Sequence, residues 1–165
     1  NALARELGVE PQMSCAEAAR LLAGASIPTN SAPAFTEARE VLTPPGASRR
    51  LVLIDSASLV EPEDAGQVIV TGSHGALFGT DPANALRVDA GFVLFNDAGG
   101  QATSRLPLLA ERGIAAATVA AASAHIGEAR STYEHGILSA CNAIAEAHGL
   151  VAGMPARKAV EIMLA

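Results

Sequence analysis

The chain has 165 residues, of which 50% are hydrophobic and 17% are charged, and its formal net charge is -6. This apolar content excludes an intrinsically disordered chain, and two cysteines are too few for a disulfide scaffold. The acidic balance and the absence of tryptophan argue against a nucleic-acid partner, which needs a cationic surface and stacking aromatics. No apolar run is long enough to span a membrane, so no membrane partner is expected.

Residues 1–26 are predicted to form an N-terminal helical arm. Ser14 precedes Glu17 by three residues, which is the spacing of a capping box, and Gly24 is a suitable helix end. Residues 27–48 are predicted to be a connector because prolines recur among serines and threonines. The main domain is then expected over residues 49–165.

The main domain alternates short apolar runs with helix-like stretches. Runs typical of strands buried on both faces lie at 51–54, 68–70, 92–95 and 114–119. Helices are predicted at 83–88, from Thr103 or Ser104 to Gly113, at 131–148 and from 155 to the end. This alternation predicts an α/β fold, a three-layer sandwich with a mostly parallel sheet of at least four strands.

The small and sulfur-containing residues bear on assembly and location. The chain has 36 alanines, and helices with small side chains can approach closely, which favours a homo-oligomer. Cys15 and Cys141 lie far apart in helix-like surroundings. We interpret both as reduced, buried thiols, which predicts a cytoplasmic protein.

Polar residues follow each of the four predicted strands directly. Asp55 follows the first, His74 the second, Asp97 the third and His125 the fourth. In open parallel sheets ligands bind outside the carboxyl ends of the strands. We therefore expect the functional site at this edge of the sheet.

His74 is the candidate general acid or base, because Gly72 and Gly75 flank Ser73-His74 and would expose the imidazole. The alternative is a turn whose histidine caps a neighbouring carbonyl. Asp97 and Asp55 are the candidate catalytic carboxylates, which would orient His74. The alternatives are an Asx-turn for Asp97 and a helix N-cap for Asp55.

Two further groups of residues are predicted to bind the ligand. Backbone amides of the glycine-rich segments would stabilise negative charge, and these segments contribute Gly72, Ser73, Gly75, Asn96, Gly99 and Gly100. Arg130, Ser131 and Thr132 begin the helix predicted at 131–148, where Ser131 and Glu134 have capping-box spacing. A helix N-terminus favours an anion, so we expect these residues to hold a carboxylate or phosphate. A purely structural cap is the alternative.

The same residues allow a divalent metal as cofactor. A bound metal ion could activate water. Oxygen and nitrogen ligands for such an ion are offered by Asp55, His74, Asp97 and His125. Their spacing matches no metal-binding motif, and a metal-free His/Asp site is favoured. The chain lacks both Gly-x-Gly-x-x-Gly and a phosphate loop, so no nucleotide cofactor is expected.

One segment resembles a known family. Ser73-His74-Gly75 with Phe78-Gly79-Thr80-Asp81, after an apolar strand, resembles the catalytic-histidine segment of caspase-like cysteine peptidases. The next strand ends in Phe95-Asn96-Asp97-Ala98-Gly99-Gly100, where that family places its nucleophilic cysteine. This region has no cysteine, so the resemblance implies shared architecture without the peptidase activity.

The sequence favours an enzyme of hydrolase or lyase type that acts on a small anionic metabolite, with His74 as acid or base. A non-catalytic subunit that binds a small ligand or regulates another protein through the same cleft is the first alternative. The second is a structural subunit of a larger enzyme, which would explain the alanine-rich helices and the proline-rich connector.

Overall fold

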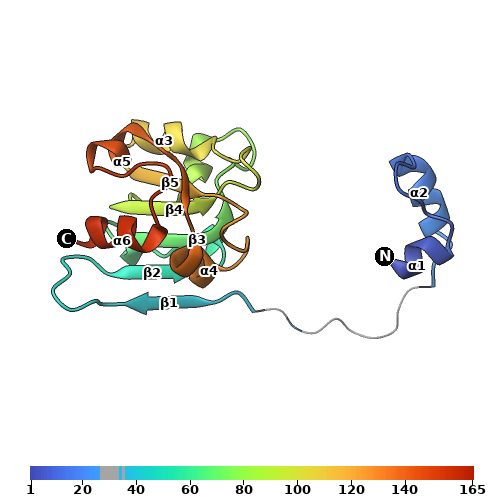
Figure 1. Ribbon diagram of the computed structural model, residues 1–165, viewed down its shortest axis with the longest axis horizontal. Helices are drawn as coiled ribbons and strands as arrows, with labels where there is room; N and C mark the ends of the chain where they lie inside the picture. Colours follow the sequence, from blue (N-terminus) through green and yellow to red (C-terminus); the bar gives the residue numbers. More distant parts are fainter. Residues whose placement is uncertain (27–33, 35) are drawn as a thin grey trace. The chain divides into compact units, whose positions relative to one another are not determined.

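The computed structural model describes residues 1–26, 34 and 36–165, in two compact units, Asn1–Phe35 and Thr36–Ala165 (Figure 1). The first unit contains α1 (Ala2–Glu6) and α2 (Cys15–Leu22). The Ser14 hydroxyl accepts a hydrogen bond from the Glu17 amide, and the Glu17 carboxylate accepts one from the Ser14 amide. The predicted capping box is therefore confirmed. Cys15, predicted to be buried, is instead exposed at the start of α2.

The second unit is an α/β fold built on one six-stranded sheet in the order β1-β2-β3-β4-β5-β6. Strands β2 to β5 are parallel, and the two edge strands pair antiparallel to them. The strands are β1 (Arg39–Leu42), β2 (Leu51–Ile54), β3 (Val68–His74), β4 (Phe92–Asn96), β5 (Ala115–Val119) and β6 (Leu138–Cys141). The four predicted strands and the mostly parallel sheet are confirmed.

The central strands form because their side chains are buried on both faces of the sheet. Every residue of β2, β4 and β5 is buried. Successive residues alternate between two separate clusters, so that Leu51 and Leu53 join one and Val52 and Ile54 join the other. This alternation is the period of two expected of an extended strand.

Helices contribute to both clusters. They are α3 (Arg105–Glu111), α4 (Ala129–His135), α5 (Ala143–Ala147) and α6 (Ala156–Leu164). Leu109 of α3 lies in the cluster of Val52, whereas Ala129 of α4 and Val160 of α6 lie in the cluster of Leu51. Three 3₁₀ turns cover Ala57–Leu59, Pro62–Asp64 and Pro82–Ala85. The helix predicted at 83–88 is thus a short 3₁₀ turn.

The single helix predicted at 131–148 is wrong. Helix α4 ends at His135, the chain then forms β6, and α5 follows separately. Gly136 permits the close packing at this break, because a Cβ at this position would collide with the Thr132 carbonyl and with Val119. Beyond it, Leu138 pairs with Val119 of β5.

Strand β1 lies within 27–48, the stretch predicted as a connector. Its Val41 and Leu42 pair with Val52 and Leu51 of β2. Residues 27–33 and 35 of that stretch lie outside the described part of the chain. Among the residues that the structure describes, no helix has the length and apolarity needed to cross a membrane.

Candidate functional site

The segments predicted to form a site meet at the carboxyl edge of the sheet. His74 at the end of β3 lies in register with Asn96 at the end of β4. The next residue, Asp97, donates its amide to the Val119 carbonyl at the end of β5, at 2.9 Å. The loop that follows β5 leads into α4. The strand-end rule therefore located one edge correctly, and the individual side chains decide what that edge can do.

The carboxylate of Asp55 holds two other elements in place. Its Oδ1 accepts a hydrogen bond from the Ala129 amide at 2.9 Å, and its Oδ2 accepts one from the Ala38 amide at 2.8 Å. Ala129 is the first residue of α4, and Ala38 precedes β1. Asp55 thus acts as a cap on a helix that begins 74 residues later in the chain.

Asp97 is buried, with 5% of its surface exposed, and its Oδ1 accepts hydrogen bonds from the amides of Gly99 (3.0 Å) and Ala121 (2.9 Å). Burial by itself raises the pKa of Asp97. The donors Ala121, Ser139, Gly99 and Gly100 outweigh burial, and the net result is a pKa below the ordinary value. The group is an ionised carboxylate enclosed by the loops that it organises.

The loop after β4 directs its polar groups inward. Asn96 is fully buried, its Nδ2 donates to the Ala124 carbonyl at 3.1 Å, and its Oδ1 accepts from the Ala98 amide at 2.8 Å. Gly99 donates its amide to the Asp97 carboxylate, and Gly100 donates to the Asp97 carbonyl. These amides were predicted to stabilise a ligand's negative charge, and here they bind Asp97.

Gly72 and Gly75 permit close packing of backbones. A Cβ on Gly72 would lie 2.5 Å from the Glu128 amide nitrogen, and one on Gly75 would collide with the Ala102 carbonyl. Gly75 donates its amide to the Asn96 carbonyl at 2.8 Å. The Ser73 hydroxyl accepts from the Ala57 amide at 2.9 Å. The two glycines thus bring the loops after β4 and β5 close to β3.

His74 is exposed at the end of β3, as predicted. Its Nδ1 accepts a hydrogen bond from the Ala76 amide at 3.2 Å. This bond assigns the ring proton of the neutral imidazole to Nε2, which makes Nε2 a hydrogen-bond donor. In this tautomer Nε2 can donate a hydrogen bond to an oxygen of a ligand.

Residues 130–132, predicted as an anion site, lie in the first turn of α4. The helix begins at Ala129 with Glu128 as N-cap, so the predicted capping box of Ser131 is wrong. The Ser131 hydroxyl accepts from the His125 amide at 3.0 Å. Buried Thr132 donates to the Glu128 carbonyl at 3.2 Å. The guanidinium of Arg130 pairs with Glu134 and Glu40 and is therefore already neutralised.

The four candidate metal ligands are distributed over different surroundings. Among the described residues, no group of three or more His, Cys, Asp or Glu side chains is placed to hold a metal ion. Asp55, His74, Asp97 and His125 therefore do not form a metal-binding cluster. Of these four, the two aspartates serve loop and helix contacts, and the two histidines are exposed.

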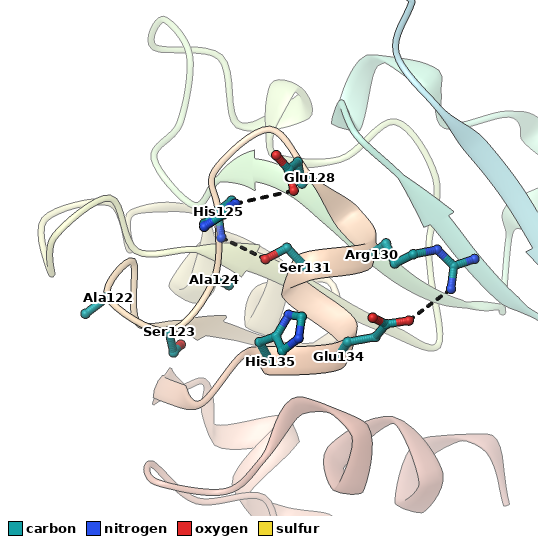
Figure 2. A pocket seen from close by; sticks show the side chains of 9 residues that line it. All are labelled: Ala122, Ser123, Ala124, His125, Glu128, Arg130, Ser131, Glu134 and His135. Atoms are coloured by element: carbon teal, nitrogen blue, oxygen red, sulfur yellow. Dashed lines mark hydrogen bonds and ion pairs between the residues drawn. The ribbon is translucent and has the colours of Figure 1, made fainter.

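A cavity of about 510 Å³ lies between the loop after β5 and α4 (Figure 2). It is lined by Ala122, Ser123, Ala124, His125, Glu128, Arg130, Ser131, Glu134 and His135. Ser131 and His135 are four residues apart, which places them on one face of α4, and Glu128 is the N-cap that precedes the helix. In Figure 2, Ser131 lies between the His125–Glu128 pair and His135.

Ionisable groups give this cavity its chemical character. His125 Nδ1 lies 3.5 Å from Glu128 Oε2, and both side chains are exposed. With its histidines neutral, the lining holds two carboxylates, Glu128 and Glu134, and one cation, Arg130. His125, Arg130 and Ser131 of this lining were predicted as site residues from the sequence. Glu128 and His135 were missed, although the four-residue spacing of His135 from Ser131 on the predicted helix could have indicated His135.

No family model matches the chain, and no curated protein and no solved structure matches it either.

Proposed function

We propose that the protein binds a small polar molecule in the cavity between residues 122–125 and α4. The cavity itself supports this proposal most directly, because its volume of about 510 Å³ lies within the range of small-molecule sites. Its position outside the carboxyl end of β5 is also where open parallel sheets bind ligands.

The charges of the lining favour a ligand with hydrogen-bond donors, such as an amine or a polyol. Glu128 and Glu134 offer acceptor oxygens, whereas Arg130 is already shared between Glu134 and Glu40. The anionic ligand expected from the sequence stays a prediction and would have to displace one of these pairs. The homo-oligomer, the cytoplasmic location and the three-layer sandwich also stay predictions.

The test is a thermal-shift screen of the full chain with amino acids, simple amines, polyols and carboxylates, followed by calorimetry on the compounds that bind. We expect an amine or polyol to bind, and Glu128→Gln or His135→Gln to weaken its affinity about tenfold, because one charge-assisted hydrogen bond is lost. His148→Gln is the matched control, since this exposed histidine does not line the cavity. Equal affinity in all three variants would contradict the proposal.

An acid–base enzyme of hydrolase or lyase type is the second candidate. The His125–Glu128 contact favours it, because a carboxylate beside an imidazole orients the ring for proton transfer. The test incubates the protein with a compound that binds and uses NMR to detect any product that forms. Turnover that falls at least a hundredfold in His125→Gln while binding persists would support this candidate. Binding without turnover would leave the chain as a binding protein.

A further inference from the structure

A second cavity, of about 210 Å³, contains a nearly buried arginine. Ser58, Phe78 and Arg105 line it and follow the carboxyl ends of β2, β3 and β4. Leu86, which also lines it, belongs to the buried cluster of Val52, whereas Ala124 of the first cavity belongs to the cluster of Leu51. The two cavities therefore lie against opposite faces of the sheet.

Arg105, the first residue of α3, is held by neutral groups. Its exposed fraction is 8%, which is low for a charged side chain. Nε donates to the Ala76 carbonyl at 3.0 Å, and Nη1 donates to the Ala85 carbonyl at 3.1 Å. The guanidinium carbon lies 5.0 Å from the centre of the Phe95 ring. These contacts orient and partly stabilise the cation but bring no negative charge to it.

The cation of Arg105 lacks a counter-ion within residues 36–165, the whole of which the structure describes. Arg39, Arg112 and Arg130 each lie within 4.0 Å of a carboxylate, and Arg105 does not. Burial lowers the pKa of Arg105, and no acidic neighbour opposes this effect. By contrast, acidic partners raise the pKa of Arg39. A buried charge without a counter-ion is costly, so an anion bound beside Arg105 would stabilise it.

The donors of Arg105 are not all used by the protein. A guanidinium has five N–H groups, and the two carbonyl contacts take one each from Nε and Nη1, so three are left. Among the described residues, no buried side-chain nitrogen or oxygen lacks a hydrogen-bond partner. Nη2 of Arg105 makes no hydrogen bond within the unit, so this atom cannot be fully buried. Its exposed surface faces the cavity that Arg105 lines.

We propose that this cavity binds a small oxyanion, the carboxylate or phosphate group of a small molecule, on the free N–H groups of Arg105. Arg87 is exposed, lines the same cavity and supplies a second cation. Its Nη1 donates a hydrogen bond to the Ser58 carbonyl at 3.5 Å. Phe78, 79% exposed, offers an apolar surface for the body of the ligand. Planar guanidinium groups suit carboxylate and phosphate equally, because both accept two parallel N–H bonds.

The experiment titrates the full chain with sodium phosphate and with sodium acetate, using sodium chloride to hold ionic strength constant. The readouts are the thermal midpoint and the NMR signal of the arginine Nε–H groups, with the Arg105 signal assigned through Arg105→Lys. We expect phosphate or acetate, but not chloride, to shift the Arg105 signal and raise the midpoint. Arg87→Gln should weaken the apparent affinity about threefold to tenfold. Arg105→Met should abolish it.

Arg157→Gln is the matched control, because this exposed arginine on α6 lines neither cavity and its loss should leave the anion response unchanged. If Arg105→Met does not fold, Arg87→Gln and the Arg105 signal of the unaltered chain decide the question. Tighter binding of phosphate or of acetate identifies the preferred group, and either supports the site. No anion-specific response, or one that Arg87→Gln leaves unchanged, would overturn the proposal.

Discussion

At the scale of single residues, the polar side chains at the carboxyl edge divide into those that organise the fold and those that face open space. Asp55 and Asp97 accept hydrogen bonds from backbone amides of distant segments, and Asn96 accepts one from the Ala98 amide of its own loop. His125 and His135 instead line the larger cavity. Sequence reasoning cannot separate the two groups, because an aspartate after a strand has the same pattern whether it binds a ligand or an amide.

The burial of Arg105 also could not be predicted from the sequence. An arginine in the first turn of a predicted helix is usually exposed, and nothing in the local pattern marks this one as buried. Its burial depends on Phe95, Ala76 and Ala85, which lie on three other segments. Only the assembled fold shows that the cation stands beside a cavity without a carboxylate.

Asp97 should make the stability of the protein depend on pH below about 5. The pKa of an aspartate in the unfolded chain is near 4, and the pKa of Asp97 in the folded chain is lower. The ionised group therefore contributes its full stabilisation at pH values above the unfolded pKa. This contribution disappears as pH falls through the folded pKa. We expect Asp97→Asn to lower the free energy of unfolding by about 3 kcal/mol at pH 7, and by progressively less as pH falls below about 4.

Chemical denaturation of both proteins at a series of pH values measures this difference. Glu111→Gln is the control, because Glu111 is an exposed carboxylate on α3, and it should show no such convergence. A difference between Asp97→Asn and the unaltered chain that stays constant from pH 7 to pH 3 would contradict the assignment.

At the scale of elements, the strands that sequence reasoning found are the ones buried on both faces. Edge strands β1 and β6 were missed because their patterns are weaker. β1 (Arg39–Leu42) is partly exposed and follows a proline-rich stretch. β6 (Leu138–Cys141) lies among residues with helical propensity, and its pairing with β5 decides its conformation.

Asp55 should couple α4 to β1 through its two amide contacts. We expect Asp55→Ala to lower the free energy of unfolding by about 3 kcal/mol, because two hydrogen bonds to a charged group are lost. It should also weaken ligand binding in the larger cavity, since α4 forms one of its sides. Asp81→Ala, which removes only a local cap on the 3₁₀ turn at Pro82, should cost about 1 kcal/mol.

Urea denaturation and amide hydrogen exchange measure these effects. Exchange of the Ala38 and Ala129 amides should accelerate in Asp55→Ala. Equal losses of stability in the two variants, with unchanged exchange at Ala38 and Ala129, would show that Asp55 does not connect the two elements.

At the scale of the whole molecule, the composition and the strand-end rule predicted an α/β fold and the edge that carries the cavities. They did not predict the separation of that edge into two cavities on opposite faces of the sheet. This division depends on which loop passes over which face, and it places the paired Arg130 at one cavity and the unpaired Arg105 at the other.

The most direct test of the account is an NMR map of backbone amides during titration with the amine or polyol that binds best. We predict that the amide signals of residues 122–135 shift together and saturate, and that the same compound leaves the signals around Arg105 in place. Saturable shifts confined to other parts of the chain would contradict the claim that this cavity is the ligand site.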